Sequence, residues 1–236
     1  MKGGIPIELD ERLSSIGSLV REGTFLIDVG TDHAYLPIAL LKSGKIAGAI
    51  ASDINEGPCK RAELNARLAG LSSKIKIMRA DGVPNIPLGG KTDIVIAGMG
   101  GTLIEEIVER ADLKKISDTR LILQPMRNTA ELREYLCENG FLITDESLSR
   151  EKNRIYEVIC AVYDGEKHNY SDLDLVLGKK NIDKKREYPK LFAYLCEKKI
   201  SSLIKKAEGK ESSGKDASFE RGLIEEIKKE RNGTEN

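Results

Sequence analysis

The N-terminal two thirds of the chain alternate between short apolar runs and amphipathic segments. An apolar residue recurs at helical spacing from Leu9 to Val20, so we expect a helix over residues 9–21 that ends at Gly23. Apolar runs predict β-strands near residues 24–29, 46–52, 75–79, 92–97 and 119–124. Helical patterns separate these runs, near residues 35–43, 57–69, 101–110 and 128–138. This alternation predicts an α/β protein with a doubly wound, parallel sheet.

Two further apolar runs follow, over residues 141–144 and 155–163, with no helical pattern between them. The segment that separates them is a polar loop containing Arg150, Lys152, Asn153 and Arg154. Consecutive strands without a crossover helix pair antiparallel. We therefore expect a terminal antiparallel hairpin, which makes a mostly parallel sheet of seven strands.

The C-terminal part is rich in lysine and arginine. Residues 179–206 carry ten Lys or Arg residues and three acids. Within this segment, mainly apolar positions recur with the period of a helix and would share one helix face: Leu191, Phe192, Leu195, Cys196, Lys199, Ile200, Leu203 and Ile204. Lys198, Lys205 and Lys206 fall on another face of the same helix. That face is either a solvated charged surface or a surface that follows RNA phosphates.

The last part of the chain predicts a helical hairpin. Residues 208–218 are rich in Lys, Glu, Ser and Gly, so we expect a mobile turn there. A returning helix then contains Phe219, Leu223, Ile224 and Ile227, and we expect frayed residues from Arg231. The chain thus divides into an α/β domain over residues 1–165 and a small helical domain over residues 166–236.

Composition limits the class of protein. The 236 residues are 40% hydrophobic, and the formal net charge is zero, so any nucleic-acid contact depends on local patches. No two of the four cysteines form a C-x-x-C pair, which argues against a zinc site and a disulfide framework. No run approaches the ~18 apolar residues of a membrane span. We expect a cytoplasmic protein with no membrane partner and no obligatory protein partner.

The strongest chemical signal is the segment Phe25-Leu-Ile-Asp-Val-Gly-Thr-Asp-His-Ala-Tyr-Leu-Pro37. An apolar run ends here in Asp28 and Gly30, a helical segment follows, and the next apolar run ends in Asp53. This order is typical of a nucleoside cofactor site at the carboxyl ends of parallel strands.

Glycine spacing separates the possible cofactors. A dinucleotide site needs several glycines so that backbone amides can approach a pyrophosphate, and here Gly30 is the one glycine of the segment. Asp32 and His33 follow it, and an acid repels a pyrophosphate but attracts a sulfonium or an ammonium group. The residues therefore favour S-adenosylmethionine. The alternative is that Asp28 and Asp32 only cap a strand and a helix.

Three further strand ends weaken that alternative. They carry Ala80-Asp81-Gly82, Gly98-Met-Gly-Gly101 and Gln124-Pro125. An acid can accept a hydrogen bond from an adenine amino group, and glycines leave room for a flat base. Ligands of open α/β sheets bind at these strand ends.

Four segments carry a resemblance to a known family: Asp28-Val-Gly-Thr-Asp-His-Ala-Tyr-Leu-Pro37, Ala51-Ser-Asp-Ile-Asn55, Ala97-Gly-Met-Gly-Gly101 and Leu123-Gln-Pro125. With the charged helical tail, they resemble the bacterial tRNA (adenine-22-N1)-methyltransferase family of class I S-adenosylmethionine-dependent methyltransferases. The resemblance spans about residues 8–230. It implies a Rossmann-like catalytic domain, a coiled-coil-like helical domain that binds tRNA, and S-adenosylhomocysteine as a product.

The resemblance also implies residue roles. Asp28, Gly30, Asp32 and His33 would surround the methionine part of the cofactor, Asp53 would accept from the ribose, and Asp81 would face the adenine. Further expected cofactor contacts are Ile54, Gly82, Gly98, Met99 and Gly100. Residues Gly98 to Gly101 stand where many amino-methylating enzymes carry an Asn/Asp-Pro-Pro-aromatic motif, which accepts from an exocyclic amine. Its absence suits a ring nitrogen, whose lone pair attacks the methyl group directly.

Two residues are catalytic candidates, and four are candidates for contact with the substrate. Asp32 could accept the N6 proton of the cationic methylated base, and His33 is the alternative acceptor. Candidate contacts to tRNA are Arg12, near the catalytic mouth, and Lys198, Lys205 and Lys206. His33 and His168 are the only histidines, and neither has a second ligand at metal-binding spacing, so we expect no metal site.

Two other classes of function stay open at this point. One is a methyltransferase for a small molecule or a protein, in which the helical tail serves for dimerisation. The other is a non-catalytic protein that binds RNA or senses the cofactor. A nicotinamide-dependent dehydrogenase fits less well, because the required glycine spacing is missing.

Overall fold

The computed structural model describes residues 8–84, 90–111, 113 and 118–233. Within them one sheet contains seven strands in the order β3-β2-β1-β4-β5-β7-β6. The strands are β1 (Thr24–Val29), β2 (Ile46–Asp53), β3 (Ile75–Arg79), β4 (Thr92–Met99), β5 (Thr119–Pro125), β6 (Phe141–Glu151) and β7 (Arg154–Tyr163). Pairs among β1 to β5 are parallel, whereas β7 runs antiparallel to both β5 and β6. The predicted architecture is confirmed.

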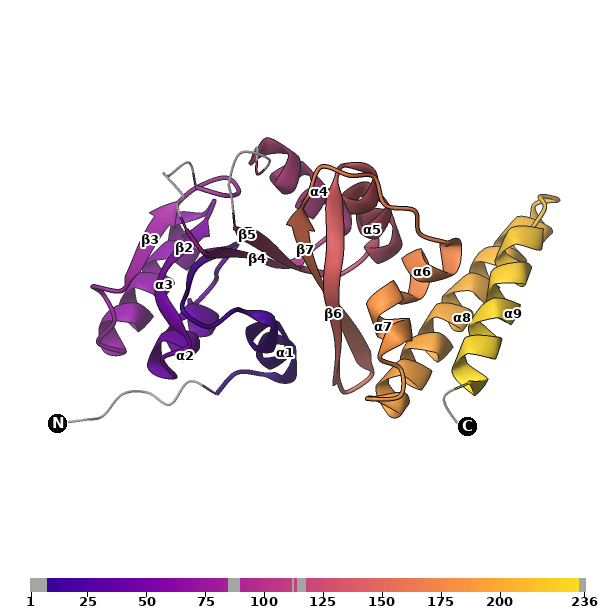
Figure 1. Ribbon diagram of the computed structural model, residues 1–236, viewed down its shortest axis with the longest axis horizontal. Helices are drawn as coiled ribbons and strands as arrows, with labels where there is room; N and C mark the ends of the chain where they lie inside the picture. Colours follow the sequence, from indigo (N-terminus) through magenta and orange to yellow (C-terminus); the bar gives the residue numbers. More distant parts are fainter. Residues whose placement is uncertain (1–7, 85–89, 112, 114–117, 234–236) are drawn as a thin grey trace.

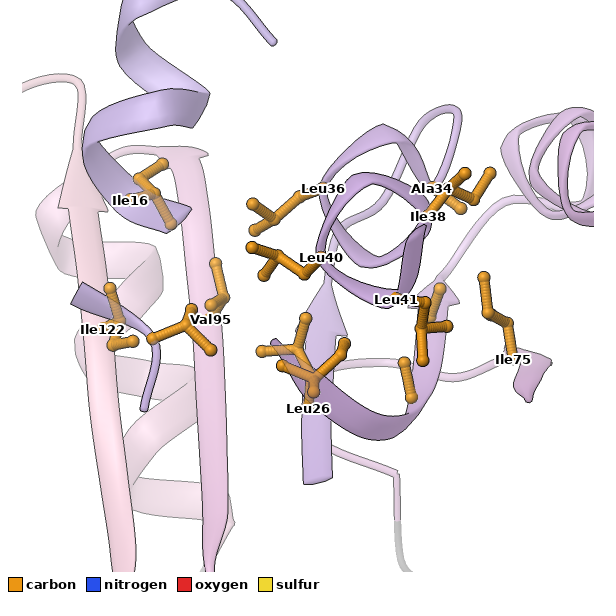
Figure 2. Close-up of a cluster of buried hydrophobic side chains, with 14 of the residues drawn as sticks. Ile16, Leu26, Ala34, Leu36, Ile38, Leu40, Leu41, Ile75, Val95 and Ile122 are labelled. Carbon is orange, nitrogen blue, oxygen red and sulfur yellow. The ribbon is translucent and has the colours of Figure 1, made fainter. Parts of the chain in front are cut away.

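Helices cover both faces of the sheet because side chains alternate along each strand. On one face, Leu26 and Val95 pack against α1 (Glu11–Leu19), α2 (Tyr35–Lys42) and α3 (Glu56–Leu68). Figure 2 shows part of this cluster, with side chains of α1 and α2 directed at the strands. On the other face, Ile27 and Ile94 pack against α4 (Gly101–Arg110) and α5 (Thr129–Glu138). The two layers fix the strand ends at one common edge.

The C-terminal helices are α6 (Asp172–Leu177), α7 (Lys179–Asp183), α8 (Pro189–Ser212) and α9 (Ser218–Asn232). Figure 1 shows α8 and α9 side by side at one end of the molecule, with α2 and α3 toward the other end. A third cluster joins these helices to the sheet, because Leu148 of β6 packs with Phe192 and Leu195 of α8 and with Leu223 of α9.

A buried ion network crosses the same boundary. Arg133 of α5 is fully buried and lies 2.7 Å from Glu146 of β6 and 2.8 Å from Glu157 of β7. Lys199 of α8 lies 2.6 Å from Glu157. These contacts connect the sheet to α8, so the packing shows no break at residue 165. The division into two domains at that residue stays a prediction.

The hairpin differs from the one expected. The prediction that its first strand ends at residue 144 is wrong, because β6 continues to Glu151 and pairs there with Arg154. The turn is confined to Lys152 and Asn153, and Lys152 has φ +50°. The extra strand length depends on a distant contact, since Leu148 is buried by the C-terminal helices.

The C-terminal boundaries also differ from those predicted. The basic segment is split between α7 and α8, and α8 runs to Ser212, so the turn covers only residues 213–217. Glu220 is fully buried and accepts from Lys210 at 2.9 Å, which ties the end of α8 to α9. Phe219 is 52% exposed and does not belong to the packing stripe. Arg231 is helical rather than frayed.

Candidate active site

A pocket of about 360 Å³ opens at the carboxyl ends of β1 and β4. Six of the predicted site residues line it: Arg12, Asp28, Gly30, Asp32, His33 and Gly98. They come from α1, from β1 and the segment that follows it, and from β4. The structure therefore brings together residues that lie up to 86 positions apart in the sequence.

Gly30 shapes the floor of this pocket. It has φ +76°, and a Cβ atom at this position would lie 2.1 Å from the Cε of Met99. The amides of Gly30 and Thr31 donate to the carbonyl oxygen of Ser52 at 2.8 and 2.9 Å, which holds the loop against β2. The positive φ favours glycine here, and any larger residue would also force the flexible end of Met99 to move.

The capping alternative is wrong for Asp32. The helix α2 begins at Tyr35 and is preceded by Ala34, whose φ is +55°. The amide of Ala34 donates to the Oγ1 of Thr31 at 3.1 Å, so Thr31 provides the local cap. The carboxylate of Asp32 is left 60% exposed at the pocket and takes no part in starting the helix.

Asp28 places a buried carboxyl group in the pocket. Asp28 is only 8% exposed. Burial raises the pKa of this carboxyl to about 6, although a hydrogen bond from Thr31 and the charge of Arg12 act in the opposite direction. No cation among the described residues forms an ion pair with Asp28, so a cationic ligand group would compensate the hydration that this buried carboxylate has lost.

Asp32 is held by two neighbours. The Nε of Arg61 donates to its Oδ1 at 3.1 Å, and the Nε2 of His33 lies 3.1 Å from its Oδ2. The hydrogen bond from Arg61 is the main cause of a lowered pKa at Asp32. The His33 ring stacks on Tyr35, with centroids 4.9 Å apart and planes 10° apart. Asp32 is thus an ionised group in a fixed position and a weak proton acceptor.

The other predicted cofactor residues lie outside this pocket but at the same sheet edge. Asp53 ends β2 and accepts from the amide of Asn55 at 2.7 Å, and the adjacent Ile54 is 52% exposed. Asp81 follows β3 and lies 2.9 Å from the Nη1 of Arg110. Gly82 follows with φ +87°. A ligand that reaches them from the pocket must extend along the strand ends.

The Gly98–Gly101 segment connects this edge to β5 and α5. Gly98 has φ +78°. A Cβ on Gly100 would lie 3.1 Å from the Nε of Arg127, and one on Gly101 would lie 2.3 Å from the carbonyl oxygen of Asn128. The amide of Met126 donates to the carbonyl oxygen of Met99 at 2.7 Å. Apart from Met99, the segment therefore carries no side chains, and it is firmly held.

Arg12 of α1 lines the same pocket as Asp28. Its Nη1 donates to the Oε1 of the fully buried Gln124 at 3.2 Å, and its guanidinium lies 6.0 Å from the Tyr156 ring centroid. The sequence indicated Gln124 as a polar strand end but carried no signal for Tyr156, Arg61 or Arg110. Each of these partners is distant in sequence from the residue that it contacts, so spacing alone does not reveal it.

The three lysines of α8 are not part of the pocket. The Nζ of Lys198 lies 5.0 Å from the Tyr194 ring centroid, and Lys205 is exposed. The Nζ of Lys206 lies 3.4 Å from the buried Glu220, and the contact of the three lysines with tRNA stays a prediction. In the described residues, no group of three His, Cys, Asp or Glu side chains has the arrangement of a metal site. No described helix is long and apolar enough to cross a membrane.

The fold and the position of this pocket define the class of protein. Residues 9–159 match the family model of a methyltransferase domain. The sheet is mostly parallel, and β7 lies antiparallel between β5 and β6. This is the Rossmann-like architecture of class I methyltransferases.

The particular family follows from closer relatives. The tRNA (adenine(22)-N(1))-methyltransferase of Bacillus subtilis (strain 168) is 35% identical over 172 residues, which cover 73% of this chain and 72% of that protein. The chain belongs to the tRNA (adenine(22)-N(1))-methyltransferase family.

Two solved structures extend the similarity over almost the whole chain. Streptococcus pneumoniae Sp1610 in complex with S-adenosyl-L-methionine has a TM-score of 0.80 and 32% identity, with 95% of this chain and 100% of that chain covered. TrmK of M. capricolum in complex with S-adenosylhomocysteine has a TM-score of 0.77 and 26% identity, with 95% and 98% covered.

Proposed function

We propose that this protein transfers the methyl group of S-adenosylmethionine to N1 of adenine 22 in bacterial tRNA and releases S-adenosylhomocysteine. The observation that carries the proposal is the carboxylate-lined pocket beside the Gly98–Gly101 segment, found in a chain of this family. The Bacillus subtilis relative supports the choice of substrate, and the two ligand complexes support the choice of cofactor. No separate observation favours a small-molecule or protein acceptor.

The residues of the pocket fit the proposed cofactor. Its volume of about 360 Å³ is in the range of small-molecule sites. Asp28 and Asp32 suit the ammonium and sulfonium groups, with Gly30 and His33 beside them. Asp53 and Ile54 would hold the ribose, and the adenine would lie near Asp81, Gly82 and the backbone of Gly98, Met99 and Gly100. When bound, the cofactor supplies an electrophilic methyl group.

The protein's contribution to the reaction is mainly to position the two reactants. Gly98 and Gly100 leave the backbone accessible, so a flat adenine can approach the pocket between this segment and Arg12. Ring nitrogen N1 has its own lone pair and needs no proton acceptor before it attacks. The product base is cationic until it loses an N6 proton.

Asp32 and His33 have different proposed roles when the product base loses its N6 proton. Because hydrogen bonding from Arg61 lowers its pKa, Asp32 stays ionised and stabilises the cationic base. His33, whose Nε2 faces the Oδ2 of Asp32, is the proposed proton acceptor. A His33→Gln variant should therefore lose more kcat than cofactor affinity.

The helical part of the chain is proposed to bind tRNA. In this proposal residues 1–165 are the catalytic domain, and residues 166–236 present Lys198, Lys205 and, more weakly, Lys206 to the phosphates. Arg12 would contact the nucleotide that enters the pocket. The pairing of Lys206 with Glu220 reduces the charge that it can offer.

The test is to incubate the purified chain with methyl-labelled S-adenosylmethionine and unmodified bacterial tRNA, followed by nucleoside mass spectrometry. We expect 1-methyladenosine, and none when adenine 22 is replaced by guanosine. Product in the guanosine-22 tRNA would refute the assigned position. Absence of label in either tRNA, with cofactor binding shown by calorimetry, would refute the assigned substrate. Activity of the chain alone also tests the expectation that no partner protein is needed.

A further inference from the structure

A cationic tip of the β6–β7 hairpin projects beyond the sheet edge where the pocket opens. The last residue pair between β5 and β7 joins Leu123 to Ile159, whereas β6 and β7 stay paired as far as Glu151 and Arg154. Because β7 runs antiparallel to β5 and Pro125 is the last residue of β5, this register sets residues 154–156 past the carboxyl end of β5. At ~3.3 Å per residue this projection is roughly 10 Å. We call residues 150–156 the hairpin tip.

The hairpin tip is fixed to α8 by stacking and a hydrogen bond. The guanidinium of Arg150 lies 3.8 Å from the centroid of the Tyr194 ring, and the Nζ of Lys198 lies 5.0 Å from the same centroid. The Tyr194 hydroxyl donates to the carbonyl oxygen of Asn153 at 2.9 Å. Figure 1 shows the turn between β6 and β7 lying between α1 and the start of α8. The tip is therefore a preorganised surface.

A second aromatic ring connects the tip to the pocket. The guanidinium of Arg154 lies 5.8 Å from the Tyr156 ring centroid, and that of Arg12 lies 6.0 Å from it. Arg12 lines the pocket, and the neighbouring Glu11 lines a second hollow of about 690 Å³ together with the hairpin tip. Cationic side chains thus follow one another from the pocket to α8.

These cations are available to an external anion. In the part of the chain that the structure describes, no carboxylate lies within 4.0 Å of the charged nitrogens of Arg150, Lys152, Arg154 or Lys198. By contrast, Lys199 and Lys206 of the same helix pair with Glu157 and Glu220. The second hollow is lined by two acids, Glu11 and Glu151, and by three cations of the hairpin tip, so its net charge is positive.

We propose that the hairpin tip, with Tyr194 and Lys198 of α8, binds the phosphates of the tRNA strand that leads to the target adenine. An arginine stacked on an aromatic ring presents the N–H groups of its edge to a phosphate, and mixed arginine and aromatic surfaces suit unpaired RNA. In Arg150 the Nε donates to the carbonyl oxygen of Lys152 at 3.0 Å, so its terminal nitrogens would contact the phosphate. The position beside Arg12 aims the bound strand at the pocket. This inference rests on the proposed function, because it assigns the path of that same substrate.

The test is the triple variant Arg150→Gln, Arg154→Gln, Lys198→Gln in the full chain, with tRNA binding measured at several KCl concentrations. Loss of three phosphate contacts should make the slope of log affinity against log salt less steep by about two. At low salt, the affinity for tRNA should fall by at least about tenfold. The KM for tRNA should rise, whereas kcat and the affinity for S-adenosylmethionine stay within about twofold.

A matched control removes the same charge elsewhere. The variant Arg67→Gln, Lys74→Gln, Lys76→Gln changes three exposed side chains on α3 and at β3. Its salt slope should equal that of the wild type. Equal losses in the two triple variants would overturn the proposal, since they would show a general effect of net charge. The charge-preserving variant Arg150→Lys, Arg154→Lys should restore the slope, which a folding defect of the hairpin would not allow.

The outcomes separate this inference from the proposed function. If the wild type forms 1-methyladenosine at position 22 but the hairpin variant binds tRNA as tightly as the wild type, only the inference fails. If the wild type forms no methylated tRNA yet its binding depends on the hairpin cations, the proposed function fails and the binding surface stands.

Discussion

Replacement of Asp28 by asparagine tests whether the pocket keeps a buried charge for its ligand. Burial is the main cause of the raised pKa of about 6 at this carboxyl. Asparagine has almost the same shape and can still accept a hydrogen bond from Thr31, but it carries no charge. We therefore expect Asp28→Asn to stabilise the free protein and to weaken the binding of S-adenosylmethionine.

The size of the effect follows from the change in pKa. A carboxyl whose pKa is 3.8 in the unfolded chain and about 6 in the folded chain destabilises the fold by about 3 kcal/mol when both states are ionised. Because the folded state binds this proton more tightly, the contribution of Asp28 to stability falls as the pH rises from about 4 to about 6. The variant should therefore be more stable than the wild type by about 1 kcal/mol at pH 4.5 and by about 3 kcal/mol at pH 7.5.

Urea unfolding at these two pH values measures the difference, and calorimetry measures the affinity for the cofactor. Asp32→Asn is the matched control, since Asp32 is 60% exposed and hydrogen bonding from Arg61 lowers its pKa. Neutralising Asp32 should not stabilise the protein at pH 7.5. The reasoning about Asp28 is refuted if its variant gains no stability at pH 7.5, or if the gain is the same at both pH values. Cofactor affinity should fall at least about tenfold, because a charge-assisted contact is lost.

Three further substitutions test other parts of the structure. Gly30→Ala should reduce stability by about 1–3 kcal/mol and weaken cofactor binding, because an alanine is strained at φ +76°; a normal melting temperature with normal binding would contradict this. Asp53→Ala should weaken cofactor binding in calorimetry but leave tRNA affinity unchanged, and equal losses of both would count against separate sites. Arg133→Met should cost about 3–5 kcal/mol in urea unfolding, because two buried glutamates lose their shared partner; a loss below about 1 kcal/mol would show that they are neutralised by other means.

The network around Arg133 also bears on the proposed division into two domains. Glu157 belongs to β7, yet Lys199 of α8 contributes to keeping its pKa low, against a large opposing effect of burial. Removing the helical part would leave that carboxylate and Leu148 without their covering contacts. The catalytic domain and the helical domain are therefore best tested in the full chain.

Much of the fold was predictable because its signals are local. The strand predicted at residues 24–29 is Thr24–Val29, and the next, predicted at 46–52, is Ile46–Asp53. Apolar runs bounded by glycine and polar residues specify strands, and parallel strands bring their carboxyl ends to one edge. The grouping of Asp28, Gly30 and Gly98 in one pocket follows from that topology.

Only the tertiary structure decided which partner each charged group has. Asp32 meets Arg61 and Asp81 meets Arg110, each 29 positions away, and Arg12 meets Gln124 at a separation of 112. Such pairs depend on how helices sit on the sheet, and no local pattern encodes that placement.

In the hairpin tip, too, the sequence determined one part of the structure and the tertiary contacts decided another. The sequence by itself determined that two strands pair near the C-terminal end of the sheet, because no crossover helix separates them. Burial of Leu148 under α8 and α9 decided how far β6 extends, and hence that Arg150 and Arg154 project beside the pocket. A strand of alternating polar and apolar residues stays paired in water only when one of its faces is covered, and here the cover comes from residues more than forty positions later in the chain.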